Sequence, residues 1–349
     1  MYALIQQIAF AEPSKSDEMR KYLTVNGEPV SCPGVRPFSL SRIDAIASSN
    51  HFEKMIGNYA MVRERAVTDP SIDTQKLDEL IIINTWRKSY WQVYSGLAIG
   101  NIGKLESELN GLLSLKYHPS NARELLKLIF YASYYFKLPQ SIQIPVISEL
   151  LETAEQNRFV RPLIVGVHGW SLPEPGSVDL ELEQYRVMQY AMEGNLDPIR
   201  KSFELLPDGS RGDAVRIRSL EILGTQSLSD AERIDAAQQL HAISFEYIDK
   251  PLCTHISVEA LVAQAKVLQN IVDYEKTILG KLTYLQEGTS ILIFATRYAT
   301  LMDNPNQWKQ IHFLLADLMS QKASYTEDPI QRSIIQLRAK RALELAVRN

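Results

Sequence analysis

The sequence predicts an all-α protein, built either as a helical-repeat-like α-solenoid or as a multi-helix bundle in two lobes, with a small N-terminal hairpin or arm. Three observations lead to this prediction. Apolar residues recur at i, i+3, i+4 and i+7 along most of the chain beyond residue 50, which is the period of an amphipathic helix. Glycine is sparse, with 16 residues in 349, whereas a turn-rich β fold needs many glycines. Residues that start or stop helices recur between the apolar stretches.

Composition and charge restrict the classes of function. Hydrophobic residues make up 45% of the chain and charged residues 22%, as in ordinary globular proteins. A net charge of −4 leaves no excess of the cations with which a dedicated nucleic-acid binder neutralises phosphates. No run approaches the roughly 20 apolar residues of a membrane helix. Cys32 and Cys253 are too few for a disulfide framework, so we expect reduced thiols and a cytoplasmic location.

The N-terminal arm is expected over residues 1–38. Its segment 22–31 places Asn26 and Gly27 between two β-prone runs, which is the usual signal for a tight β-hairpin. A proline-rich turn follows this segment. The sequence therefore predicts a small hairpin or extended arm ahead of the helices.

An N-terminal helical lobe is expected over residues 39–160. The apolar face of residues 52–59 predicts a first helix, with Asn50 as its N-cap. A second helix is expected from 71 to about 94. The stretch 121–139 is apolar nearly all round, as expected of a helix buried between neighbours.

A Gly/Pro-rich crossover over residues 161–178 is expected to join this lobe to a second helical lobe over 179–349. The sequence GVHGWSLPEPG at 166–176 is the least helical part of the chain. In one interpretation His168 is a weak candidate for the general base of a catalytic site. In the other, Trp170 anchors a joint between the lobes. No nucleophile or carboxylate partner of His168 is identifiable from the sequence, which favours the joint.

Three signals divide the C-terminal lobe. SDAE at 229–232 is a capping box that predicts the start of a helix. Residues 257–287 follow one helical pattern with a heptad-like apolar seam, suited to pairing with a neighbouring helix or with a second chain. Pro305 is expected at the first position of the next helix, and TEDP opens the last helix at about 327.

Two corners of the chain look alike. Gly100-Asn101 and Gly194-Asn195 each follow a helical stretch and precede aliphatic residues at the same spacing. Glycine ends a helix in the left-handed conformation, and asparagine is a good cap for the next helix. These corners resemble those of tetratricopeptide and HEAT repeats, and the resemblance implies an α-solenoid architecture only. A non-repeating bundle would contain such corners too.

The standard catalytic signatures are missing from the sequence. There is no G-x-S-x-G elbow, no eight-residue phosphate loop and no H-E-x-x-H motif. Cys253 and His255 lie two residues apart, but two ligands do not make a zinc site. We therefore expect no metal and no cofactor. The tripeptide RGD at 211–213 is interpreted as a helix start, with Asp213 as the cap.

Two aromatic clusters give the best candidate for a groove that binds a ligand or a partner. Aromatic rings beside an arginine can stack on sugars, bases or side chains of a partner. The alternative interpretation is packing in the core, with each tyrosine hydroxyl reaching the surface. The candidate groove residues are Trp86, Arg87, Tyr90, Trp91, Tyr94, Tyr131, Tyr134 and Tyr135.

The end of the chain carries a basic tip formed by Arg338, Lys340 and Arg341. These cations are suited to phosphates or to an acidic partner. The alternative is a solvated face whose cations favour the C-terminal end of a helix.

The leading functional hypothesis is a non-enzymatic interaction or assembly module, a scaffold that binds a protein partner or self-associates. One alternative is an enzyme, or the accessory domain of an enzyme, with a pocket near His168 and the aromatic clusters. Another is a helical nucleoprotein or coat subunit that uses the basic tip and the N-terminal arm. We expect a protein partner or a second copy rather than nucleic acid, and no membrane insertion.

Overall fold

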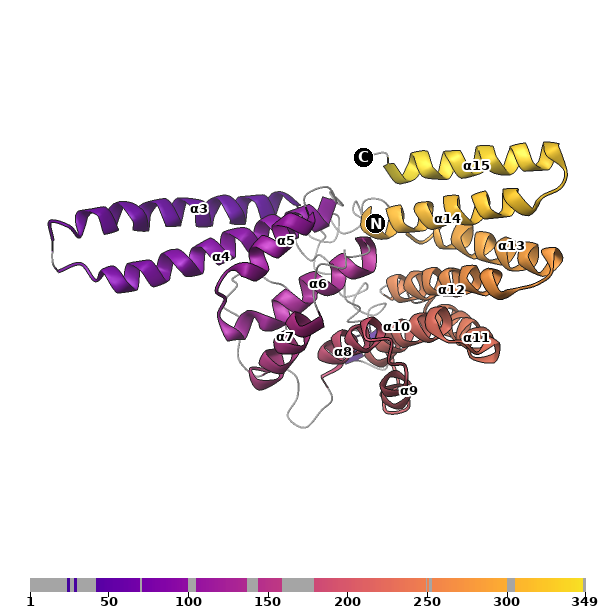
Figure 1. The fold of residues 1–349 in the computed structure, drawn as a ribbon, viewed down its shortest axis with the longest axis horizontal. Coiled ribbons are helices and arrows are strands. Elements are labelled where there is room, and N and C mark those ends of the chain that lie inside the picture. Colours follow the sequence, from indigo (N-terminus) through magenta and orange to yellow (C-terminus); the bar gives the residue numbers. More distant parts are fainter. Residues whose placement is uncertain are drawn as a thin grey trace.

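The computed structural model describes residues 24–25, 28–29, 42–69, 71–99, 105–136, 144–158, 179–248, 250, 253–299 and 305–347. Within these ranges the chain forms thirteen α-helices, one 3-10 helix and two strands of two residues each (Figure 1). The all-α prediction is confirmed for this part of the chain.

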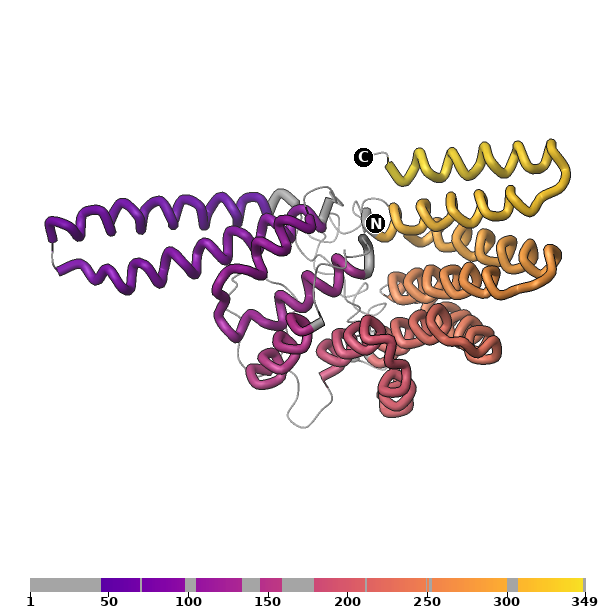
Figure 2. Tube along the Cα trace, in the orientation of Figure 1, coloured from indigo at the N-terminus to yellow at the C-terminus, as the bar shows by residue number. Residues whose placement is uncertain are grey.

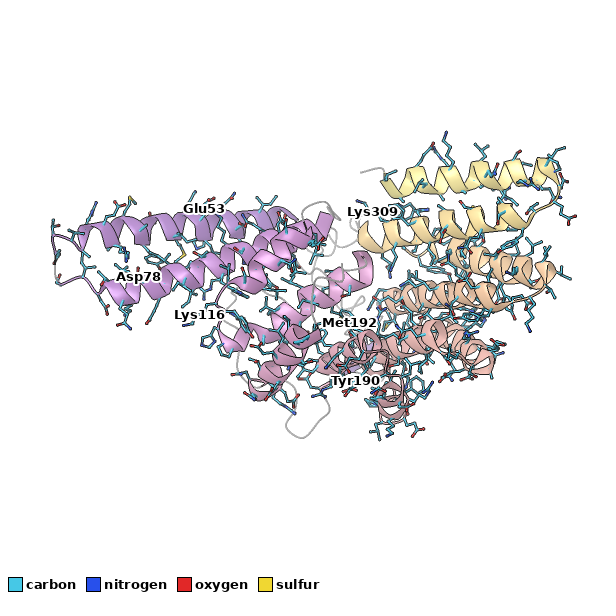
Figure 3. All side chains as sticks on the ribbon, in the orientation of Figure 1. Glu53, Asp78, Lys116, Tyr190, Met192 and Lys309 are labelled. Carbon is cyan, nitrogen blue, oxygen red and sulfur yellow. The ribbon has the colours of Figure 1, made fainter. Side chains whose placement is uncertain are left out.

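The N-terminal half is dominated by a long antiparallel hairpin of two helices, α3 and α4, that projects from the rest of the molecule (Figures 1 and 2). Exposed ion pairs tie these two helices together: Lys88 contacts Glu53 at 2.7 Å, and Arg63 contacts Asp78 (Figure 3 labels the two acids). The helices of this half are α3 (Arg42–Arg65), α4 (Thr74–Ile99), α5 (Leu105–Ser114), α6 (Ala122–Phe136) and α7 (Ile144–Gln156), with the 3-10 helix η2 (Pro119–Asn121) before α6.

The C-terminal half is a stack of helices in which each helix packs against the next (Figure 1). From α10 onward the stack consists of three consecutive antiparallel hairpins, and α10 also packs against α12. The helices are α8 (Leu180–Met192), α9 (Asp197–Phe203), α10 (Ser210–Gln226), α11 (Asp230–Tyr247), α12 (Thr254–Tyr274), α13 (Ile278–Ala295), α14 (Pro305–Tyr325) and α15 (Pro329–Val347).

Helix α8 belongs to both halves, because side chains on its two faces are buried in different hydrophobic cores. Leu182, Tyr185 and Met188 are buried in the core formed with α3–α7. Val187, on another face, is buried with Ile199 of α9 in the next core along the stack. The described helices therefore form a continuous series of cores, each sharing a helix with its neighbour.

The predicted N-terminal hairpin is present as a short antiparallel pair. Strand β1 (Thr24–Val25) pairs with β2 (Glu28–Pro29), with Thr24 opposite Pro29 and Val25 opposite Glu28. Residues 26 and 27, which we expected to form the turn, lie outside the described residues.

Several helix boundaries follow the signals in the sequence. Ser229 is the N-cap of α11, and its side chain accepts a hydrogen bond from the Glu232 backbone N–H at 3.3 Å. Pro305 and Pro329 each occupy the first position of a helix, where the missing N–H costs no intrahelical bond.

The corner at Gly194 ends α8 in a Schellman motif. Gly194 has a φ of 69°, a left-handed conformation that glycine adopts without steric cost. The backbone N–H of Asn195 donates to the Tyr190 carbonyl at 2.9 Å, and that of Gly194 donates to Ala191 at 3.2 Å. The predicted role of Gly194 is confirmed. The similar corner at residues 100–101 lies outside the described residues.

Two expected caps are wrong. Helix α3 begins at Arg42 rather than after Asn50, because no proline or glycine stops the helix between them. Asn195 does not cap α9, whose N-cap is Leu196 with no side-chain hydrogen bond.

The RGD segment also differs from the prediction. The N-cap of α10 is Gly209, and Asp213 is instead buried in the first turn, where it accepts hydrogen bonds from Tyr247 and Arg216. A Cβ at Gly212 would lie 1.8 Å from the carbonyl oxygen of Pro207, so close backbone packing requires glycine there.

The single long helix expected over residues 257–287 is wrong. Helix α12 ends at Tyr274, and α13 begins at Ile278. The side chain of Glu275 accepts a bond from the Thr277 N–H at 2.8 Å, and Thr277 caps α13 by accepting from Gly280 at 3.0 Å. Such local side-chain bonds satisfy backbone groups outside a helix and compete with its continuation.

The expectation of reduced thiols is wrong for Cys253. Its side chain is fully buried at the start of α12, and it is disulfide-bonded. The other cysteine of the sequence, Cys32, lies outside the described residues.

Candidate functional site

The aromatic residues of α4 lie inside the N-terminal core. Trp86, Tyr90, Trp91 and Tyr94 are each at most 5% exposed. The Tyr90 ring stacks on Trp86 at 5.5 Å between centroids and meets Trp91 edge-on at 5.2 Å, geometries typical of aromatic packing in a core. Their burial fits the core interpretation and leaves no open aromatic surface at these four side chains.

The other candidate groove residues have mixed positions. Tyr131 of α6 is buried in the same core. Arg87 lies over the Phe52 ring, 5.6 Å from its centroid, and burial lowers the pKa of its guanidinium. Tyr134 and Tyr135 belong to α6, but their side chains lie outside the described residues.

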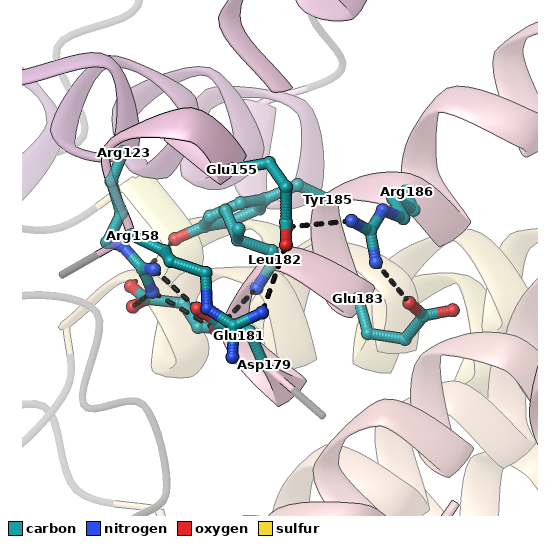
Figure 4. A network of polar contacts seen from close by, with 9 residues as sticks. All are labelled: Arg123, Glu155, Arg158, Asp179, Glu181, Leu182, Glu183, Tyr185 and Arg186. Atoms are coloured by element: carbon teal, nitrogen blue, oxygen red, sulfur yellow. Dashed lines mark hydrogen bonds and ion pairs between the residues drawn. The ribbon is translucent and has the colours of Figure 1, made fainter. Parts of the chain in front are cut away.

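A buried ion-pair network joins α6 to the start of α8 (Figure 4). Arg123 contacts the N-cap residue Asp179 through both terminal nitrogens and Glu181 at 2.9 Å. Asp179 in turn accepts a bond from the Leu182 backbone N–H at 3.2 Å. Burial would raise the pKa of Asp179, but the hydrogen bonds and charge of Arg123 hold it below its usual range. This network fixes where α8 begins.

The same network holds both ends of the predicted crossover. Arg158, the last described residue before it, bonds Glu155 at 3.1 Å, and Glu155 also accepts from Arg186 of α8 at 2.9 Å. The charge of Arg158 also helps to lower the pKa of Asp179, the first described residue after the crossover. The crossover itself lies outside the described residues, so the joint stays a prediction. His168 lies outside the described residues.

Ionisable side chains also meet inside the N-terminal core. The Tyr90 hydroxyl donates to Glu124 at 3.2 Å, and burial raises the pKa of Glu124. Burial alone would lower the pKa of Lys127, but the carboxylates of Glu124 and Glu181 raise it above its usual value. The charge of Lys127 therefore does not offset the desolvation of Glu124, whose carboxyl group stays easier to protonate than in water.

A second charged cluster lies where α10 faces α12. Glu221 accepts from Arg218 at 2.6 Å and from Lys266 at 2.7 Å, which keeps its pKa below the usual range despite burial. Glu259 of α12 is half-buried beside them. Desolvation and the charge of Glu221 raise the pKa of Glu259 to about 7, against the attraction of Arg218 and Lys266. This cluster was not predicted from the sequence, because its members lie far apart in the chain, on two different helices.

Among the described residues, an exposed aromatic surface is formed by an aromatic ladder that we define as His241, Phe245, Phe294 and Tyr298. His241 and Phe245 lie on α11 and Phe294 lies on α13, the second helices of two neighbouring hairpins, and Tyr298 lies in the turn that follows α13. Phe245 is 54% exposed and Tyr298 37% exposed, whereas Phe294 is partly buried against the C-terminal core.

The rings of the aromatic ladder contact one another in sequence. The centroids of His241 and Phe245 lie 4.7 Å apart, those of Phe245 and Phe294 6.5 Å apart, and those of Phe294 and Tyr298 5.2 Å apart. The guanidinium of Arg297 lies 5.8 Å from the Phe294 centroid. Neighbouring packing holds the rings in fixed positions, which lowers the entropy lost when a partner binds. The i, i+4 spacing of each aromatic pair is visible in the sequence, but it does not show that the two pairs meet.

The basic tip lies on the last helix, α15. Arg338, Lys340 and Arg341 are all exposed. Arg341 forms an ion pair with Glu344 at 3.2 Å, where both partners are solvated and the pair contributes little to stability.

No group of three or more His, Cys, Asp or Glu side chains suited to a metal ion occurs in the part of the chain that the structure describes. Among the described helices, none has an apolar stretch long enough to cross a bilayer. Comparison of the chain with known protein families, with curated proteins and with solved structures finds no match.

Proposed function

We propose that this protein is a non-enzymatic interaction module that binds a protein partner, or a second copy of itself, through the aromatic ladder. The observation that carries the proposal is the exposure of Phe245 and Tyr298 on two adjacent hairpins. Large aromatic side chains supply much of the binding energy at protein interfaces, because they bury a large area with few rotatable bonds.

Two further features support the ladder as an interface. Arg297 and His241 add polar groups at the edge of the rings, and aromatic residues with arginine are enriched at interfaces. Ile234, also exposed, lies seven residues before His241 on the same face of α11 and enlarges the apolar area.

The test compares the double variant Phe245→Ser/Tyr298→Ser with the wild type. Phe313→Ser is the matched control, because Phe313 is an exposed phenylalanine on α14, outside the ladder. Each protein serves as bait in cross-linking capture with quantitative mass spectrometry, and its solution mass is measured by light scattering.

We expect the wild type and Phe313→Ser each to capture one partner, either another protein or a second copy of the chain, in a molar amount close to that of the bait. The double variant should not capture this partner. A wild type that is a monomer, and whose captured proteins do not differ from those of the double variant, would contradict the proposal. Circular dichroism must show the same helix content in all three proteins.

The cytoplasmic location stays a prediction from the sequence, and the disulfide of Cys253 argues against it, because such bonds persist mainly in oxidising compartments. Alkylation of Cys253 in cells that are quenched and denatured in the presence of the alkylating reagent, followed by mass spectrometry, distinguishes the two, because denaturation exposes this buried side chain. A reactive Cys253 would support the cytoplasm, and a protected one would support an oxidising compartment.

A further inference from the structure

Helix α15 is the last described helix of the C-terminal stack, and it packs mainly against α14. Its buried face is made of the small residues Ala339, Ala342 and Ala346, and Ile335 is partly buried beside them. Small side chains allow the two helices to approach closely. No described helix covers the opposite face of α15.

That opposite face carries a row of exposed apolar side chains. Ile330, Ile334 and Leu337 are 73%, 47% and 69% exposed, and their i, i+4, i+7 spacing places them in one line along the helix. The terminal helix of a helical stack normally has a polar outer face that keeps the protein soluble. An apolar row at this position is typical of a surface to which a further helix is added.

Basic residues flank the C-terminal half of the row, which we call the α15 row and define as Ile330, Ile334 and Leu337. The exposed acids Glu327 and Asp328 precede its N-terminal end. The row continues into Arg341, and Arg338 and Lys340 flank it on either side. No described carboxylate forms an ion pair with Arg338 or Lys340. Lys322 of α14 lies close enough to Arg338 for that charge, together with burial, to lower the pKa of Lys322. The C-terminal half of the row therefore attracts negative charge.

We infer that the α15 row is a docking site for one amphipathic helix of a partner protein, with an apolar stripe flanked by Asp and Glu. The stripe would cover Ile330, Ile334 and Leu337, and the acids would pair with Arg338, Lys340 and Arg341. The partner helix would extend the stack by one layer. This surface is separate from the aromatic ladder, so the inference goes beyond the proposed function.

A second copy of the chain is a poorer occupant of this row. In a parallel pairing of two α15 helices the cations of one copy would face those of the other. A dimer in light scattering that Leu337→Asp dissociates would assign the row to a second copy and overturn the inference. An anionic membrane is also less suited, because interfacial helices bury a broad apolar face, whereas this row is one residue wide.

The experiment uses the full-length protein and a designed helical peptide of about 20 residues, similar in length to the 19 residues of α15. The peptide has leucine at heptad positions a and d and glutamate at e and g, and a twin peptide has lysine in place of glutamate. Binding is measured by fluorescence anisotropy at low salt. Leu337→Asp tests the row, and Leu279→Asp is the matched control, because Leu279 is an exposed leucine on α13.

We expect the wild type to prefer the glutamate peptide over the lysine peptide by at least about tenfold. Leu337→Asp should weaken binding by about tenfold or more, whereas Leu279→Asp should leave it unchanged. The triple variant Arg338→Glu/Lys340→Glu/Arg341→Glu should reverse the preference of the protein for the two peptides. All variants change exposed residues, and equal circular dichroism spectra check that they are folded.

The inference is overturned if the wild type binds neither peptide, binds both equally, or is insensitive to Leu337→Asp. Sedimentation with phosphatidylserine vesicles that depends on Leu337, without peptide binding, would assign the row to a membrane surface and also overturn it. The ladder variant Phe245→Ser/Tyr298→Ser should still bind the peptide. The outcome for this row is therefore independent of the outcome for the ladder.

Discussion

The two aromatic groups of the molecule have similar composition and opposite environments. In α4, Trp91 and its neighbours are sealed in the N-terminal core, whereas Phe245 and Tyr298 of the aromatic ladder face solvent. Both groups use i, i+4 spacing, although Tyr298 lies in the turn just after α13. The difference comes from the surrounding helices: α4 is packed by α3, α5 and α6, whereas the ladder faces of α11 and α13 have no described helix over them.

Ring content and helical spacing therefore do not distinguish a core from an interface. The apolar residues around each ring are a better guide, because a core ring has apolar neighbours on every side. A variant in one environment can be compared with a matched variant in the other. The expected loss in the free energy of unfolding is large in the core and small at the surface.

The largest effect is expected for Trp91→Ala. Removing this fully buried ring leaves a cavity and should lower the free energy of unfolding by about 4 kcal/mol. Phe245→Ala, at an exposed position, should change it by less than about 0.5 kcal/mol. Urea titration followed by circular dichroism measures both. Similar losses for the two variants would contradict the assigned environments.

Arg123→Ala should destabilise the protein by about 3 kcal/mol, because it leaves Asp179 and Glu181 near a buried site without their cation. Arg341→Ala removes an exposed ion pair and should cost at most about 0.5 kcal/mol. In Arg123→Ala, the backbone amides at the start of α8 should be the first to lose protection from hydrogen exchange. Unchanged exchange there would show that the network does not fix this helix end.

Glu259 predicts a pH dependence of stability. Its pKa is about 7 in the folded protein and 4.5 in the unfolded chain, so the folded state binds more protons between these values and becomes less stable as the pH rises through them. The loss from pH 5 to pH 8 should be about 2 kcal/mol, since one pKa unit corresponds to about 1.4 kcal/mol.

Glu259→Gln should remove the part of the decline that Glu259 contributes, because glutamine stays neutral, whereas a contribution from Glu124 would remain. Glu287→Gln, a change at an exposed glutamate of α13, is the control and should keep the decline. Urea titrations of the three proteins at pH 5 and pH 8 provide the measurement. A change in stability from pH 5 to pH 8 that is the same in the wild type and in Glu259→Gln would show that Glu259 has an ordinary carboxylate pKa.

Much of the fold was predictable from the sequence because helix signals are local. The capping residue Ser229, the left-handed Gly194 and the first-turn Pro305 and Pro329 each act within one helical turn. The break between α12 and α13 was missed, because the apolar period continues across Glu275 while side-chain bonds at Thr277 stop the helix.

Less of the candidate site was predictable, because it depends on which helix faces which. Phe245 and Phe294 lie far apart in the sequence and become neighbours only when two hairpins stack, and no local pattern states that. The same holds for Glu259, whose raised pKa depends in part on Glu221 of another helix. The basic tip was visible in the sequence, but the apolar row beside it required the packing of α15 on α14 to be known.

Hydroxyl-radical footprinting with mass spectrometry tests most directly the claim that one aromatic group is core and the other is a free surface. We predict fast oxidation of Phe245 and Tyr298 and slow oxidation of Tyr90 and Trp91, relative to the intrinsic reactivity of each side chain. Equal protection of the two groups in the isolated protein, or faster oxidation of Trp91 than of Phe245, would contradict that claim.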